Sequence, residues 1–139
     1  MKPLVSVAAL VLSVGATAAA ACGVCVEDKI AAAYDHALIT RSIANKHAVV
    51  FYALDGPLAG GEAQVRALRR AAEGARGADP GSARVSLESG SLSVAFDPQR
   101  APYAAFEKSL ERNLAGSGVS LLLLRVMDRP VESKKVARP

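Results

Sequence analysis

Two cysteines, Cys22 and Cys25, have the clearest chemical potential in this chain, and they are its only two thiols. Their C-x-x-C spacing lets both sulfurs bind one soft metal ion or form a bond with each other. Thiolates select Cu(I), Zn or similar soft ions, and two of them can hold Cu(I) in a near-linear site. The pair therefore predicts either a metal clip or a redox couple.

The segment before the cysteines has the pattern of an export signal. Lys2 supplies a positive start, residues 4–14 are apolar, and the small, alanine-rich stretch that follows contains overlapping A-x-A cleavage patterns. We therefore expect residues 1–21 to be a signal peptide and the mature protein to be periplasmic or secreted, without stable membrane insertion. Lipidation of Cys22 is a less favoured alternative, because Ala19 stands where a lipobox usually has Leu.

The composition of the mature chain excludes several classes of function. About 118 residues remain after cleavage, enough for one domain with its own core. Without Lys2 there are 16 basic and 13 acidic side chains, a formal charge of +3, and the chain has no Trp. This composition does not indicate a nucleic-acid partner. No catalytic triad or phosphate loop stands out, so we expect no enzyme, a thiol–disulfide oxidoreductase being the only enzymatic alternative.

The first half of the mature chain predicts a helix, a strand and a second helix. Residues 26–45 have helical periodicity, with Glu27 and Asp28 in the expected first turn, where the helix dipole favours acids. Residues 47–54 form a dense apolar run, typical of a strand that is buried on both faces. Residues 62–76 carry an apolar stripe at helical spacing.

The second half predicts a hairpin, a helix and a last strand. Residues 85–88 and 92–96 alternate around Ser89-Gly90, which indicates two half-buried strands, each with one polar face. A helix follows from about Pro102, and residues 119–127 form a strand that is apolar on both faces. We expect residues 129–139 to be a flexible basic tail.

The order of elements over residues 47–128 predicts an α+β fold, the ferredoxin-like βαββαβ sandwich. Residues 22–46 would add the C-x-x-C segment and an N-terminal helix. In this topology the first and last strands are neighbours, and they are the two strands that are apolar on both faces. Something must therefore cover their outer face, and the N-terminal helix or a homodimer partner would do so.

The stretch from Arg84 to Pro98 resembles the second and third strands of the heavy-metal-associated domain, the small copper-chaperone module. That family typically ends its third strand in a Tyr/Phe-Asp-Pro step, matched here by Phe96-Asp97-Pro98. The resemblance covers roughly residues 47–127 and implies, by analogy, copper handling with a metal donor or acceptor protein. The family places its C-x-x-C after the first strand. Here that loop, residues 55–61, has no thiol, so the pair is displaced onto the N-terminal helix.

His36 and His47 are the additional candidate ligands, since a structural zinc site usually has four ligands. Cys25 and His36 share one face of the predicted helix but stand 11 residues apart, about 16 Å along its axis. One ion could therefore reach both only across an antiparallel helix pair. The favoured interpretation is a surface or packing residue for His36 and a strand-start residue for His47.

Redox chemistry is the competing interpretation of the cysteine pair. An exported protein meets an oxidising compartment, where the pair can close as a disulfide. Such a short bridge would stabilise the fold little. Thioredoxin-like motifs also follow a strand, and no predicted strand precedes Cys22.

We predict an exported Cu(I) carrier or buffer with Cys22 and Cys25 as ligands, Zn being the alternative ion. The other interpretations are a thiol–disulfide redox protein and a partner-binding module with a structural disulfide.

Overall fold

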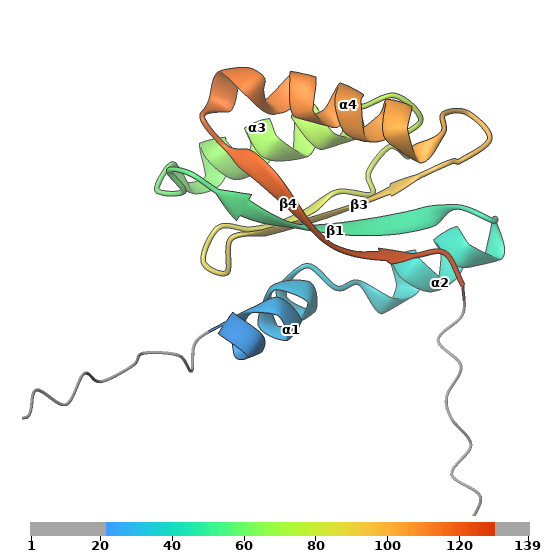
Figure 1. The fold of residues 1–139 in the computed structure, drawn as a ribbon, viewed down its shortest axis with the longest axis horizontal. Coiled ribbons are helices and arrows are strands. Elements are labelled where there is room, and N and C mark those ends of the chain that lie inside the picture. The colour runs from blue at the N-terminus through green and yellow to red at the C-terminus, as the bar shows by residue number, and fades with distance from the viewer. Residues whose placement is uncertain (1–21, 130–139) are drawn as a thin grey trace, which may run out of the picture.

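A four-stranded antiparallel sheet lies between two layers of helices in this protein (Figure 1). The structure is a computed structural model that describes residues 22–129, with side chains from Val26 onward. The predicted signal peptide, and the predicted tail from residue 130, lie outside the described residues. The sheet order is β2-β3-β1-β4. This order confirms the predicted α+β fold of ferredoxin-like topology, with the first and last strands as neighbours.

The elements follow the predicted order along the chain. Helices α3 and α4 cover one face of the sheet, and α1 and α2 cover the other (Figure 1). No helix in the described part of the chain is long and apolar enough to cross a membrane. The bounds are α1 Cys22–Ala32, α2 His36–Ala44, β1 Ala48–Asp55, α3 Gly61–Glu73, β2 Arg84–Ser86, β3 Ser91–Phe96, α4 Tyr103–Leu114, the 3-10 helix η1 Ala115–Ser117, and β4 Ser120–Met127.

The larger core lies between the sheet and the α3–α4 layer. On α4 the buried residues Phe106, Leu110 and Leu114 recur at the predicted helical spacing. The Phe106 ring stacks on Phe96 of β3, with ring centroids 4.4 Å apart. Leu68 of α3 is also buried in this cluster. The apolar stripes predicted for both helices are therefore the faces that hold them against the sheet.

A second, smaller core lies on the opposite face of the sheet. Ile30 of α1 and Leu38 and Ile39 of α2 pack against Val49 and Phe51 of β1. This contact confirms that the N-terminal segment covers the outer face of β1. The burial of these side chains accounts for the position of α1 and α2, because each helix would otherwise leave its apolar face in water.

The N-terminal segment forms two helices, and the prediction of one helix over residues 26–45 was wrong. The break precedes α2, where Asp35 has an extended backbone and its carboxylate accepts a 3.0 Å hydrogen bond from the Leu38 N–H. An Asp in this N-cap position starts a new helix and interrupts the preceding one. The first helix also begins earlier than predicted, at Cys22, so Glu27 and Asp28 lie beyond its first turn.

Of the two hairpin strands that the sequence predicts to be half-buried, β2 is half-buried along its length, and β3 is not. β2 is short, and Leu87 lies in the turn outside it. β3 is buried along its whole length, and its serines Ser91 and Ser93 are each 1% exposed. The reason is topological: β3 lies between β2 and β1, and α1 covers the face on which its serines lie.

The last strand, β4, is less buried than its sequence predicts. Its sequence predicts a strand buried on both faces, yet β4 pairs only with β1 and lies at an edge of the sheet. Leu122 is 65% exposed, Leu123 44% and Val126 41%. The helices that cover β1 do not extend over these side chains, so the predicted cover is incomplete at β4.

Candidate metal site

The two cysteine positions lie in the first turn of α1, since the helix begins at Cys22. Positions three residues apart lie on one face of a helix, so Cys22 and Cys25 share one side of this turn. The first turn of a helix has unpaired backbone N–H groups and a partial positive charge, which together favour a thiolate over a thiol. The backbone therefore places both cysteines where thiolates are stabilised.

Lys29 ties α1 to the turn between β2 and β3. Its ammonium group donates hydrogen bonds to the carbonyl oxygens of Ser89 and Gly90, the second at 3.2 Å. Lys29 also follows Cys25 by four residues, which makes the two positions neighbours on the helix surface.

A second contact joins α1 to the edge strand. The Arg125 guanidinium of β4 donates to the Glu27 carboxylate at 2.7 Å. Both side chains are well exposed, 42% and 67%, so this ion pair contributes little to stability. With the Lys29 contacts, it fixes the direction of α1 across the sheet.

The start of α1 lies at the end of the sheet where β1 finishes (Figure 1). The Leu54 N–H near the end of β1 donates a 2.8 Å hydrogen bond to Gly90, whose carbonyl oxygen also accepts from Lys29. The expectation drawn from residues 84–98 would place a metal motif in the loop after this strand. The displaced cysteine pair is therefore at the corresponding end of the sheet but in the helix layer on the opposite face.

The loop after β1 is closed by its own polar groups. The Gln64 side chain donates to the Pro57 carbonyl oxygen at 2.6 Å and accepts from the Gly60 N–H at 2.8 Å. No residue between Asp55 and Gly61 has a thiol. In place of soft metal ligands, this loop has an internal hydrogen-bonded turn.

His36 is an exposed residue at the start of α2. Its Nδ1 lies 3.5 Å from the Tyr34 hydroxyl, and the two rings are stacked with centroids 6.4 Å apart. The Tyr34 ring in turn lies 6.5 Å from that of Phe51. In Figure 1, α2 continues away from the start of α1, so one protomer does not bring His36 to the cysteine turn.

His47 lies at the other end of the sheet, between α2 and β1, and binds two carboxylates. Its Nδ1 is 2.7 Å from Asp79 Oδ2, and its Nε2 is 3.6 Å from Asp97 Oδ2. Asp79 belongs to the loop before β2, and Asp97 follows β3. The imidazole thus joins three segments of the chain and is also remote from the cysteine turn.

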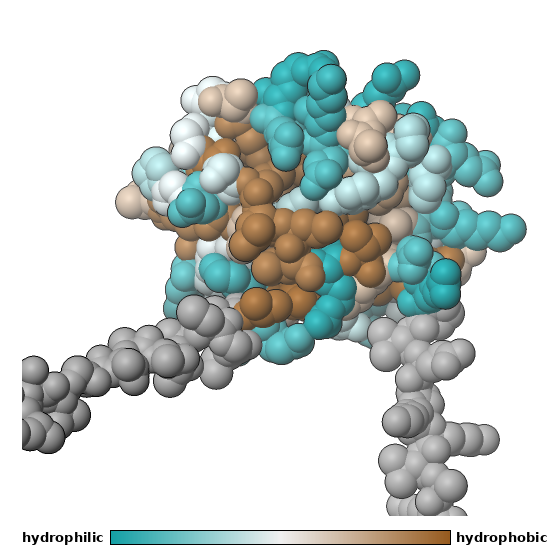
Figure 2. Space-filling view, in the orientation of Figure 1, coloured by the Kyte–Doolittle hydropathy of each residue, from teal (hydrophilic) through white to brown (hydrophobic). Residues whose placement is uncertain are grey.

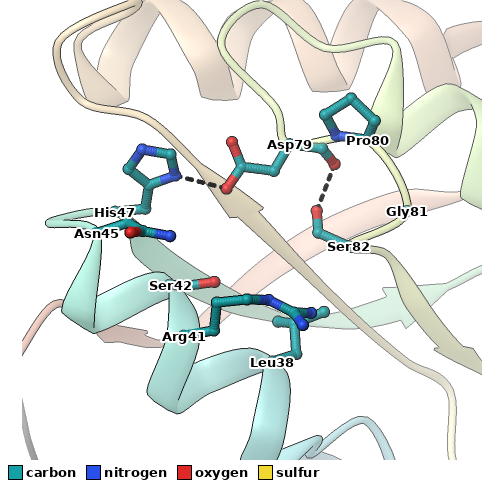
Figure 3. Close-up of a pocket in the computed structure, with 9 residues that line it drawn as sticks. All are labelled: Leu38, Arg41, Ser42, Asn45, His47, Asp79, Pro80, Gly81 and Ser82. Atoms are coloured by element: carbon teal, nitrogen blue, oxygen red, sulfur yellow. Dashed lines mark hydrogen bonds and ion pairs between the residues drawn. The ribbon is translucent and has the colours of Figure 1, made fainter.

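A pocket of about 230 Å³ lies beside His47 (Figure 3). Figure 3 shows the imidazole directed toward Asp79, with Arg41 and Ser42 contributed by α2. The Ser82 hydroxyl donates to the Asp79 carbonyl oxygen at 2.6 Å and shapes the opposite wall. The sequence prediction missed both aspartates as partners of His47. In the sequence, the only feature that marks Asp79 and Asp97 is that each precedes a proline, which is typical of residues in turns.

Among the residues that the structure describes, no three His, Cys, Asp or Glu side chains are grouped so that they could hold a metal ion. His47 and its two aspartates do not form such a group, and His36 has no acidic neighbour among its recorded contacts. The cysteine side chains lie outside this description.

The charged N-cap of α2 is the site of one clear pKa shift. The hydrogen bond from the Leu38 N–H, and after it the Arg84 guanidinium, lower the pKa of the Asp35 carboxyl below its ordinary 3.8. Arg84 Nη2 lies 2.9 Å from Asp35 Oδ2. This ion pair connects β2 to the link between α1 and α2, so it is structural.

The tyrosines of the larger core offer no ionised group to a site. Burial raises the pKa of Tyr52 and of Tyr103. The Tyr103 hydroxyl donates to Glu107 at 2.9 Å and lies 3.4 Å from the Tyr52 hydroxyl. Both phenols therefore stay protonated at neutral pH and act as hydrogen-bonding groups within the fold.

Comparison with models of protein families, with curated proteins and with solved structures found no match for this chain. The resemblance to heavy-metal-associated domains therefore depends on the motif in residues 84–98 and on the topology of the sheet. Site residues and function are inferred from the chain itself.

Proposed function

We propose that this protein is an exported carrier or buffer of a soft metal ion, with Cu(I) as the preferred ion and the thiolates of Cys22 and Cys25 as its ligands. The observation that carries the proposal is the position of both cysteines, three residues apart, in the first turn of α1. A helix start favours thiolates, and two thiolates on one helix face suit a soft ion of low coordination number.

The neighbourhood of this turn supports carriage over catalysis. Lys29 stands one turn further along the helix and is held by the β2–β3 turn. No group of three or more His, Cys, Asp or Glu side chains lies among the described residues. A site made of the two thiolates alone would keep open positions for the ion. An open two-thiolate site suits ligand exchange with a metal donor or acceptor protein. Zn is the alternative ion, and it would need two further ligands from water or a partner.

A titration with Cu(I) tests the proposal directly. The reduced mature chain, starting at Cys22, would be titrated against a chromophoric Cu(I) chelator, next to the double variant Cys22→Ser/Cys25→Ser. We expect one ion per chain and at least a hundredfold loss of affinity in the double variant, since serine hydroxyls are poor ligands for a soft ion. Equal, weak binding by both proteins would reject the proposal.

Thiol–disulfide exchange is the alternative function, because a helix start also activates a redox cysteine pair. The reduction potential of the Cys22–Cys25 pair separates the alternatives. A value well below about −300 mV would mark a structural disulfide, whereas a higher value would favour redox exchange. Thiol titration of protein taken directly from the cell envelope would show which state the pair has in the cell.

Export to the periplasm is part of the same proposal. It is supported by the apolar, alanine-rich pattern of residues 1–21 that ends just before the cysteine pair. N-terminal sequencing of the protein from a periplasmic fraction should find a start at or next to Cys22. A protein that keeps Met1 and stays with the cytoplasmic fraction would contradict this part of the proposal.

A further inference from the structure

We infer that β4 is an interface strand and that a second copy of this chain pairs with it antiparallel across a two-fold axis. The two four-stranded sheets would then form one sheet of eight strands. The inference depends on the edge of β4 that no described strand pairs with, on its apolar side chains and on the composition of the two segments outside the described residues.

The outer edge of β4 is open. The strand pairs with β1 over Ser120–Met127, and no described strand lies on its other side. An edge strand presents a row of backbone N–H and C=O groups that can pair with another strand. At eight residues, β4 is as long as β1, the longest strand of the sheet interior.

Apolar side chains flank this edge on both faces of the sheet. Leu123 lies opposite Tyr52, on the face covered by α3 and α4, while Leu122 lies opposite Ala53, on the other face. With Val126, they are three of the four large apolar residues exposed in the described part of the chain. Figure 2 shows the resulting apolar patch over β4.

Of the devices that usually block an edge strand, β4 has one, an irregularity in its pairing with β1 between the partners of Phe51 and Tyr52. Its sequence, SLLLLRVM, contains neither Pro nor Lys, and Arg125 is its single charged residue. The Glu27 carboxylate, 2.7 Å away, neutralises that charge. Natural monomeric sheets rarely leave a long, apolar edge strand with so little protection, because it invites pairing with another chain.

The composition of the two segments outside the described residues does not favour either of them as a cover for this edge. Residues 130–139 begin with a proline and carry four charged side chains, so their composition does not match an apolar patch. Residues 1–21 are apolar, but we predict that they are removed on export. We therefore infer that the occupant is another molecule.

A second copy fits this edge in both geometry and charge. Two identical strands that pair antiparallel give an isologous interface, so each copy supplies the edge that the other needs. With the two-fold axis within residues 121–124, Arg125 does not face Arg125 of the second copy, so the two arginines are not opposed. The pairing covers the exposed leucines of both copies at once.

This interface does not involve the cysteine turn, so it can be tested without metal or disulfides. The mature chain with Cys22→Ser/Cys25→Ser would be examined by sedimentation equilibrium over a range of concentrations. We expect a dimer, whose dissociation constant rises at least tenfold in Leu122→Lys/Leu123→Lys. The matched control is Tyr34→Lys, which replaces the fourth exposed apolar residue and should leave the dimer unchanged.

A spin-label measurement keeps the inference testable if the lysine variant does not fold. With one label at a Leu122→Cys position in the same background, the two labels of a dimer should lie close together across the seam. Labels at an exposed position of α4, Ala104→Cys, should lie further apart. A monomer at every concentration, including one that binds lipid vesicles instead, would overturn the inference. A dimer with distant Leu122→Cys labels would do so as well.

Discussion

The Ser93 hydroxyl of β3 donates a 2.7 Å hydrogen bond to the carbonyl oxygen of Ala33, just after α1. Both residues are buried, so this bond fixes the end of α1 over the centre of the sheet. Ser91 lies two residues earlier on the same face and is equally buried. Its hydroxyl has no hydrogen-bond partner among the described residues. The two serines therefore have the same burial but different roles.

Replacing these two serines should separate the effect of the hydrogen bond from that of the side chain. Ser93→Ala should lower the free energy of unfolding by about 1–3 kcal/mol, because it leaves the buried Ala33 carbonyl without its partner. Ser91→Ala should cost less than about 0.5 kcal/mol or stabilise the protein, because it removes a buried hydroxyl that lacks a partner. Urea unfolding of the two variants measures this difference. Equal losses in both would show that the Ser93–Ala33 bond does not hold α1.

The Asp35 carboxylate should stabilise the fold only while it is ionised. Its pKa is lowered in the folded state, chiefly by the Leu38 N–H and then by Arg84. The unfolded chain therefore binds a proton more readily, and this stabilisation decreases as the pH falls through the ordinary value of 3.8.

Unfolding experiments at several pH values test this expectation for Asp35. The Asp35→Asn variant should be less stable than the parent protein at pH 7, and the difference should shrink between about pH 5 and pH 2. Asp28→Asn is the control, because Asp28 is an exposed residue of α1 with no recorded ion pair in the described part of the chain. A difference that stays constant with pH would mean that the charge of Asp35 has no part in capping α2.

His47 should matter for stability and not for metal binding. His47→Ala removes the imidazole that joins Asp79 and Asp97, so both carboxylates lose this partner. We expect a loss of about 1 kcal/mol in unfolding free energy at neutral pH. The Cu(I) affinity should stay within about twofold of the parent protein, as it should in His36→Ala. A large loss of affinity in either variant would make that histidine a ligand.

Substitution of Gly56 should destabilise the fold because of its backbone conformation and its close approach to Gly118. It has φ +135°, and a Cβ added there would lie 2.5 Å from the Gly118 carbonyl oxygen, where the chain enters β4. Gly56→Ala should therefore cost at least about 2 kcal/mol, since neither backbone segment can move without breaking the pairing of β1 with β4. Gly116→Ala is the matched control, because no atom lies within 4 Å of a Cβ there. Thermal unfolding that shows similar stability for both variants would contradict this close approach.

Much of the fold could be predicted because its signals are local. The 3.6-residue spacing of Phe106, Leu110 and Leu114 identifies the buried face of α4 without knowledge of the rest of the chain. The break between α1 and α2 also has a local cause, the capping side chain of Asp35, although the helical periodicity of residues 26–45 concealed it. The prediction joined two helices because it weighed periodicity above a single capping residue.

The site could be predicted only in part. The C-x-x-C spacing identifies Cys22 and Cys25, and their place in the first turn of α1 follows from where the helix begins. The partners of His47 could not be predicted, because Asp79 is 32 residues away in sequence. Such contacts depend on which strand ends meet at one end of the sheet.

The sequence by itself determined the class of fold, the order of its elements and the chemistry available to the cysteine pair. Only the tertiary structure decided which strands are buried. The serine-containing β3 lies inside the sheet and is covered on both faces, whereas the leucine-rich β4 lies at its edge. The burial of a strand depends on its neighbours in the sheet and on the helices above and below it. A run of leucines has the same local pattern at the centre of a sheet and at an edge that pairs with another molecule.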